Sequence, residues 1–403
     1  MVYFVSYFSR KDFAAAMAGM ILGGDLAREN AGLIGTMLFA FYGAGQLISG
    51  YLGDRIKPRD LILIGLSATA VCNILMPLIP EWAMIAVWGV NGLAQAMLWP
   101  PIVKLLSTYL DHKTYVSANL IVTSAAHVAT IILYAYTPIC LSFMTWDWVF
   151  YTATVLAVIS AVVFAVALRY VLPDSPLGAT DREPNDTTLS ECTAERENIL
   201  TVLRRSGVFT VFVCIVVCGF LRDGIESWLP TLYSEAFGRS ASESTLLSII
   251  LPIFSIISIT LITVLHKGKL FNNEVSGTLA LFSAALASTL PLAILLNFEG
   301  RVFGFISLFL AAFICAAMHG VNFLLISCLP GRFAATGRAA TVSGVCNSCI
   351  YVGAAISTYG IALISGEHGW VATVISWSVV LAVGIAFAIL SIRRYTSMIN
   401  KQH

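Results

Sequence analysis

A short basic loop separates two apolar runs in the stretch Gly50-Tyr51-Leu52-Gly53-Asp54-Arg55-Ile56-Lys57-Pro58-Arg59. The runs on either side, near 31–53 and 60–80, can each form a helix of about 20 residues, which is long enough to cross a bilayer. Glycine lets two helices approach closely, and Asp54 can accept a hydrogen bond from a neighbouring helix end or arginine. Basic side chains favour the cytoplasmic side of a membrane. The stretch therefore predicts two membrane-spanning helices that are joined in the cytoplasm.

The composition extends this prediction to the whole chain. Of its 403 residues, 58% are hydrophobic and only 11% are charged, whereas a soluble globular protein has about 25% charged residues. One soluble core cannot bury so much apolar surface, so lipid must solvate most of it. The net charge of +1 says nothing about nucleic acid, but no basic tail or patch of that kind appears, so we expect no nucleic-acid partner.

The apolar runs predict an all-α integral membrane protein with twelve transmembrane helices. The predicted ranges are 1–24, 31–53, 60–80, 82–110, 115–138, 144–171, 207–236, 243–265, 275–297, 301–327, 338–364 and 369–392. Most connections are short, but 172–205 is rich in proline and charge. The chain is therefore divided into an N-terminal bundle (1–171), a cytoplasmic linker (172–205) and a C-terminal bundle with a short tail (206–403).

The placement of the 23 lysines and arginines supports this topology. With both termini in the cytoplasm, most of them fall in cytoplasmic segments. The opposite side then holds only Arg28, Arg239 and Arg301. This asymmetry is the one that cytoplasmic loops of membrane proteins have.

Charged residues interrupt the first helix of each half. Arg10, Lys11 and Asp12 lie in 1–24, and Arg222, Asp223 and Glu226 lie in 207–236. Charges at membrane depth are costly and usually mark a functional site. In a transporter built from two repeats, these helices face each other across a central cavity, so we expect Arg10 and Arg222 to converge there.

Two arginines in one cavity favour an anionic ligand. The planar guanidinium fits the oxygens of phosphate or carboxylate. Lys11 points about 100° away from Arg10 on the helix, and we predict that it pairs with Glu226 between the halves. The alternative is a charge-balanced scaffold without ligand, with Arg10 paired to Asp223 as well as Lys11 to Glu226. Buried ion pairs stabilise weakly, which favours the ligand.

Other polar and sulfur-bearing residues give weaker signals. His127 and His319 each lie inside an apolar helix, where packing is an alternative to a role in a cavity. Gln95, Trp99, Pro100 and Pro101 indicate a kink and a packing site. The cysteines lie mostly within apolar runs at helical spacings, so we predict small packing residues and no metal site. No nucleotide loop or nucleophile–base pair is evident, so we expect no cofactor and no enzyme activity.

Several motifs resemble one family. The string G-x-L-x-D-R-x-x-x-R at Gly50–Arg59 is the loop signature of the major facilitator superfamily. The segments Tyr7–Phe13 and Leu221–Pro230 are similar to the two phosphate-arginine segments of its organophosphate–phosphate antiporters, which include glycerol-3-phosphate and hexose-6-phosphate transporters. The resemblance implies two pseudo-symmetric six-helix bundles around a central cavity, the major facilitator fold.

The resemblance also implies residue roles. Arg10 and Arg222 bind the phosphoryl group, His127 falls where the family has a substrate-site histidine, and Gln46 replaces a family lysine. Lys11 and Glu226 form a switchable pair between the halves. The cytoplasmic gate comprises the four residues Gly50, Asp54, Arg55 and Arg59.

The function implied is secondary transport of a phosphorylated metabolite, in exchange for inorganic phosphate, by a monomer in the plasma (inner) membrane. Two alternatives stay open. One is transport of another organic anion, such as a carboxylate, which the same arginines could bind. The other is a transporter-shaped sensor of sugar phosphate, which signals to a partner.

Overall fold

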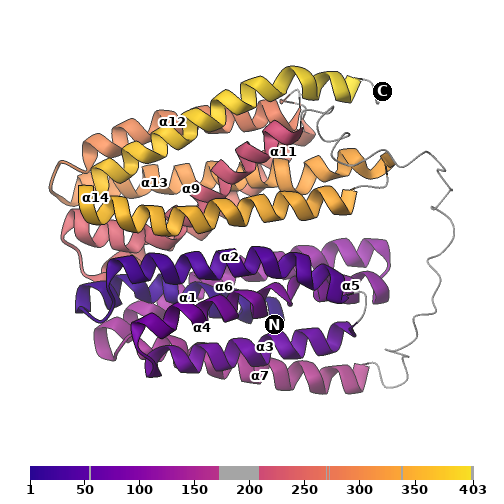
Figure 1. The fold of residues 1–403 in the computed structure, drawn as a ribbon, viewed down its shortest axis with the longest axis horizontal. Helices are drawn as coiled ribbons and strands as arrows, with labels where there is room; N and C mark the ends of the chain where they lie inside the picture. Colours follow the sequence, from indigo (N-terminus) through magenta and orange to yellow (C-terminus); the bar gives the residue numbers. More distant parts are fainter. Residues whose placement is uncertain (54–55, 172–207, 269, 272, 337–338, 401–403) are drawn as a thin grey trace.

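The computed structural model describes residues 1–53, 56–171, 208–268, 270–271, 273–336 and 339–400. Within these ranges the protein is all-helical, without a β-strand. In Figure 1 the helices of the first half lie along one another in one part of the molecule, and those of the second half lie beside them.

The first half contains seven α-helices and one short 3-10 turn within the described residues. They are α1 (Val2–Gly23), α2 (Arg28–Gly53), α3 (Pro58–Leu75), η1 (Met76–Leu78), α4 (Glu81–Ala96), α5 (Trp99–Tyr109), α6 (His112–Phe143) and α7 (Asp147–Val171).

The second half follows the residues that the structure does not describe. Its elements are α9 (Val208–Phe237), α10 (Ala241–Leu247), α11 (Ile250–Lys267), α12 (Glu274–Leu295), α13 (Arg301–Asn322), η2 (Phe323–Cys328), η3 (Leu329–Thr336) and α14 (Ala339–Asn400). The η2 segment is a π-helical turn that continues α13.

Breaks in the helices explain where the elements differ from the predicted ranges. The range 82–110 is interrupted after α4, where Met97 and Leu98 turn before Pro100 and Pro101. Proline lacks a backbone donor and clashes with the preceding turn, so the helix restarts there. The range 243–265 is likewise divided between α10 and α11. By contrast, the two predicted helices 338–364 and 369–392 form one long element, α14. Its helical backbone is interrupted at Gly369, where φ is +77°.

Two glycines set the close packing of α9 against α14. A Cβ atom on Gly219 would lie 2.0 Å from the carbonyl oxygen of Ile350, and one on Gly353 would lie 2.0 Å from that of Val216. Both contacts are with backbone, which cannot move aside as a side chain can. Only glycine therefore fits at this crossing, which brings α9 and α14 into close contact.

Seven stretches of the described helices are long and apolar enough to cross a membrane, by length and composition alone. Many of their apolar side chains point outward. On α7, Val155, Val158, Ile159 and Val162 are each about half exposed. Such a surface is stable in lipid and not in water.

Candidate functional site

A cavity of about 420 Å³ lies between the two halves. Its walls come from α1, α2, α6, α9, α13 and α14, together with neighbouring segments. It brings together all six side chains assigned to the substrate site and the ion pair, namely Arg10, Lys11, Gln46, His127, Arg222 and Glu226.

Arg10 of α1 is buried without a carboxylate partner among the described residues. Its guanidinium lies over two aromatic rings, with Cζ 4.2 Å from the Tyr7 centroid and 4.9 Å from that of Tyr42. Its Nε is buried and makes no hydrogen bond to any part of the chain that the structure describes. Cation–π contacts offset part of the desolvation cost but leave the hydrogen-bonding capacity and the charge available. Arg10 therefore keeps a charge and a hydrogen-bond donor that an anion in the cavity could use.

Arg222 of α9 is held more firmly. Its Nη1 donates to Asn322 Oδ1 at 2.8 Å, and its Nη2 donates to Asp223 Oδ2 at 2.6 Å. Asp223 thus pairs with the arginine beside it and not with Arg10. The charge-balanced scaffold considered above is not formed, because half of it required an Arg10–Asp223 pair.

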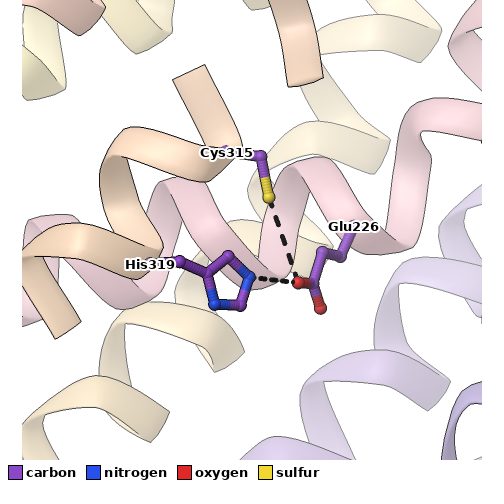
Figure 2. A group of neighbouring side chains, drawn as sticks. All are labelled: Glu226, Cys315 and His319. Atoms are coloured by element: carbon purple, nitrogen blue, oxygen red, sulfur yellow. Dashed lines mark hydrogen bonds and ion pairs between the residues drawn. The ribbon is translucent and has the colours of Figure 1, made fainter. Parts of the chain in front are cut away.

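Glu226 contacts side chains from both halves of the molecule. Lys11 Nζ donates to its Oε2, which links α1 to α9 across the halves. His319 Nε2 lies 2.7 Å from its Oε1, and Cys315 Sγ lies 3.9 Å from the same oxygen (Figure 2). Tyr134 of α6 donates to the Glu226 backbone carbonyl at 3.1 Å. One carboxylate therefore ties the first half to two helices of the second.

His127 and Gln46 lie on the first-half side of the cavity. The Nδ1 atom of His127 lies 3.3 Å from the Thr123 carbonyl oxygen, and its ring centroid is 6.3 Å from that of His319. Gln46 of α2 is partly buried and lines the cavity. Both can reach a ligand that occupies it.

A polar layer behind Arg10 fixes the position of α1. Asn73 of α3 and Asn91 of α4 each donate to the Ser9 carbonyl oxygen at 3.3 Å. Ser6 donates to Gln95 Oε1 at 2.5 Å, and Gln95 donates to Thr69 at 3.2 Å. Gln95 is thus a packing residue between helices, next to the break that precedes Pro100.

The predicted gate is only partly described. Gly50 lies in the last turn of α2, and Arg59 lies in the first turn of α3. The Nε atom of Arg59 is buried and has no hydrogen bond to any residue that the structure describes. Asp54 and Arg55 lie outside the described residues, so the gate stays a prediction.

Sequence reasoning missed three kinds of contact. Tyr7 lies one turn before Arg10, a helical spacing that could have revealed their contact. Tyr42 and Tyr351 come from α2 and α14, with ring centroids 4.5 Å apart. Asn322, which binds Arg222, comes from α13. Nothing local in the sequence brings these last residues together.

Comparisons with known proteins bear on the family and the fold of this chain. The model of the Major Facilitator Superfamily matches residues 1–358. Among solved structures, the nucleoside transporter NupG superposes with a TM-score of 0.72 over 98% of this chain and 97% of that one, at 15% identity. This last likeness concerns the fold alone.

Three curated relatives have partial matches. A probable hexose phosphate transport protein of Chlamydia trachomatis is 36% identical over 108 residues, which are 26% of this chain and 23% of that protein. The membrane sensor protein UhpC of Escherichia coli is 27% identical over 248 residues, and the glycerol-3-phosphate transporter of Bacillus subtilis is 25% identical over 252. These two matches each cover 59% of this chain and 56% of the relative. The matches thus span from about a quarter to just over half of the relatives' length.

Proposed function

Because this chain belongs to the major facilitator superfamily, we propose that it is a secondary active transporter of a phosphorylated small metabolite, which it exchanges for inorganic phosphate. It is a multi-pass membrane protein of a transporter family and not an enzyme, as its sequence predicted. The phosphorylated substrate is supported by the names of two relatives, a probable hexose phosphate transport protein and a glycerol-3-phosphate transporter.

The observation that carries the proposal is the uncompensated charge of Arg10. A buried guanidinium without a carboxylate is costly unless a ligand neutralises it. Arg222 lines the same cavity from the other half and carries a donor fork of its own. A phosphoryl group between them would accept hydrogen bonds from both and draw the halves together.

The fold we propose has twelve spans in two six-helix bundles, at 1–171 and 206–403, with 172–205 as a cytoplasmic linker. This count takes α4 with α5 and α10 with α11 as single spans, and divides α14 at Gly369. Positive residues favour cytoplasmic termini. The proposed setting is the plasma (inner) membrane, and the proposed state is a monomer without a nucleic-acid partner.

Exchange would proceed by alternating access. A ligand can shift the equilibrium between two conformations only by binding one of them better. Phosphate held by Arg10 and Arg222 would favour the state in which both arginines reach it. The Lys11–Glu226 pair would form and break between states, and His127 and Gln46 would contact the organic part of the substrate. Gly50, Asp54, Arg55 and Arg59 would close the cytoplasmic end.

The test is counterflow in proteoliposomes. Vesicles that contain the purified protein are loaded with unlabelled phosphate and then diluted into radiolabelled phosphate. We expect label to accumulate transiently, and hexose 6-phosphates or glycerol 3-phosphate to compete better than their dephosphorylated forms. Transport that requires no internal phosphate would contradict exchange. Stronger competition by dicarboxylates than by phosphates would favour the carboxylate alternative.

A sensor is the second candidate function, because the chain is 27% identical to the membrane sensor protein UhpC over 248 residues. A sensor would bind phosphorylated ligands without sustained flux. Ligand binding in detergent together with no counterflow in proteoliposomes would favour it. If the protein shows counterflow, and the ligands rank in the same order of affinity in binding and in counterflow, the transporter is favoured.

A further inference from the structure

Besides the two arginines, the cavity region holds three potential metal ligands, and Figure 2 shows that these three side chains point toward one another. They are a carboxylate oxygen of Glu226 on α9, the thiol of Cys315 and the Nε2 atom of His319. Cys315 and His319 are one turn apart on α13, so they present their side chains on the same face of the helix. The three ligand atoms lie within 4.8 Å of one another.

The separations suit a tetrahedral ion. Zinc holds sulfur at about 2.3 Å and nitrogen or oxygen at about 2.0–2.2 Å, so its tetrahedral ligand atoms lie roughly 3.3–3.8 Å apart. The sulfur–oxygen separation of 3.9 Å is close to this range. The nitrogen–oxygen separation of 2.7 Å is that of a hydrogen bond, and it would lengthen as the metal takes the place of the shared proton.

The surroundings also suit a metal. Cys315 is fully buried, while Glu226 and His319 have side chains 15% and 13% exposed toward the cavity. A fourth coordination position would therefore face the cavity, where water can fill it. Lys11 binds the other oxygen of Glu226 and so can hold the ligating carboxylate in place, as outer partners of metal ligands do.

We propose that Glu226, Cys315 and His319 bind a divalent transition metal of the zinc class. Thiolate, imidazole and carboxylate together are the ligands that zinc prefers, and magnesium or calcium would not select a thiol. This site goes beyond the proposed transport of phosphorylated metabolites and does not depend on it. It also differs from the sequence-based expectation, since only Cys315 and His319 are near each other in the chain.

The test uses Co²⁺ as a substitute for zinc in the purified full-length protein in detergent. Bound at Cys315, Co²⁺ gives a thiolate-to-cobalt absorption band, which excess Zn²⁺ abolishes. We expect one equivalent to bind. Cys315→Ser should remove the band, and His319→Gln should raise the apparent Kd at least ~10-fold. Cys349→Ser, which changes a partly buried cysteine of α14, is the matched control and should keep the band.

Two results would overturn the site. One is the absence of a thiolate band in the wild-type protein, and the other is a band that persists in Cys315→Ser. A rise of the melting temperature with Zn²⁺ in the wild type, absent in Cys315→Ser, gives a second measurement. Because neither measurement needs phosphate, the metal site and the transport function can fail independently.

Discussion

Arg10 is the residue on which the proposed substrate site depends. It is 8% exposed and rests on Tyr7 and Tyr42. Arg222, in contrast, is already bonded to Asp223 and Asn322. The two arginines are therefore unequal: Arg10 can give an anion its full charge, whereas Arg222 gives a charge that Asp223 partly offsets.

Replacing either arginine with lysine keeps the charge and removes the planar fork. We expect Arg10→Lys and Arg222→Lys each to weaken phosphate binding by about 10- to 100-fold, the value of one or two charged hydrogen bonds. Counterflow and binding competition measure the effect. Arg301→Lys is the control: it changes an exposed arginine at the start of α13 and should not alter phosphate binding. Phosphate exchange as fast as wild type in both cavity variants would refute the arginine site.

Gln46 offers a neutral amide to the same cavity. Gln46→Lys adds a positive charge, so this variant should bind inorganic phosphate more tightly than the wild type and the organic substrate more weakly. The second pKa of inorganic phosphate lies close to neutral pH, so the dianion becomes more abundant as pH rises. The gain should therefore grow with pH. Competition binding between about pH 5.5 and 8 brackets this pKa, and an unchanged affinity across it would show that Gln46 does not contact the ligand.

At the scale of elements, Glu226 links α9 to α1, and these two helices would separate in the proposed transport cycle. It pairs with Lys11 of α1 and with His319 of α13. Only the Lys11 pair crosses between the halves, because His319 belongs to the same half as Glu226. Opening of the cavity would therefore break one pair and leave the other.

Single changes in this pair should be more harmful than the double change. Lys11→Ala leaves a buried carboxylate and Glu226→Ala leaves a buried ammonium, each at a cost of about 3–5 kcal/mol. We expect each variant to lose most counterflow, and Lys11→Ala with Glu226→Ala to recover part of it. Recovery should stay incomplete, because His319 then also loses its acceptor. A double variant no better than the worse single one would argue against coupling.

The crossing of α9 and α14 should not tolerate a methyl group. In Gly219→Ala the new Cβ would clash with the Ile350 carbonyl oxygen, so α9 must shift. We expect this to lower the free energy of unfolding by about 1–3 kcal/mol. A lower melting temperature in detergent measures this. Gly360→Ala, also on α14, has nothing within 4 Å of the new atom and serves as control. Equal melting temperatures for the two variants would contradict the close contact.

The elements show which parts of the structure the sequence could predict. Arg10, Lys11, Arg222 and Glu226 could be selected from the sequence, because a charged residue inside an apolar helix carries a free-energy cost of burial and therefore stands out. Pro100 and Pro101 predicted the kink near Met97, although 82–110 was predicted as a single helix and forms the two helices α4 and α5. Contacts such as Arg222 with Asn322, which are 100 residues apart, depend on the path of the chain and have no local signature.

For the molecule as a whole, the halves are joined on one side of the cavity. Within the described residues, the hydrogen bonds and ion pairs between them run from Lys11 and Glu226 to the end where α1 turns into α2. At that end Arg28 Nη2 donates to Glu235 Oε1 at 2.5 Å and Nη1 donates to Ser365 at 3.0 Å. If the termini are cytoplasmic, as we propose, this end would face outward and the cavity would be closed to the outside.

Removing the Arg28–Glu235 pair should open that end more often. We expect Glu235→Gln to raise, about two- to fivefold, the rate at which an impermeant maleimide added outside labels Ala31→Cys in the cavity of an otherwise cysteine-free protein. Glu243→Gln breaks a pair that α10 makes with nearby Arg239 within the same half and is the control. Equal rates in the two variants would mean that Arg28 and Glu235 do not close the cavity.

The ring of Trp370 contacts both members of the Arg28–Glu235 pair, and its intrinsic fluorescence can report on this contact. Its Nε1 donates to Glu235 at 2.8 Å, and the Arg28 guanidinium lies 5.7 Å from the ring centroid. Separation of the halves would remove the cation, while Glu235 stays with the indole because both belong to the second half. The emission of Trp370 would then change with each opening, so in a variant that keeps Trp370 and replaces the other tryptophans, fluorescence could follow the outward-facing state in time without an attached dye.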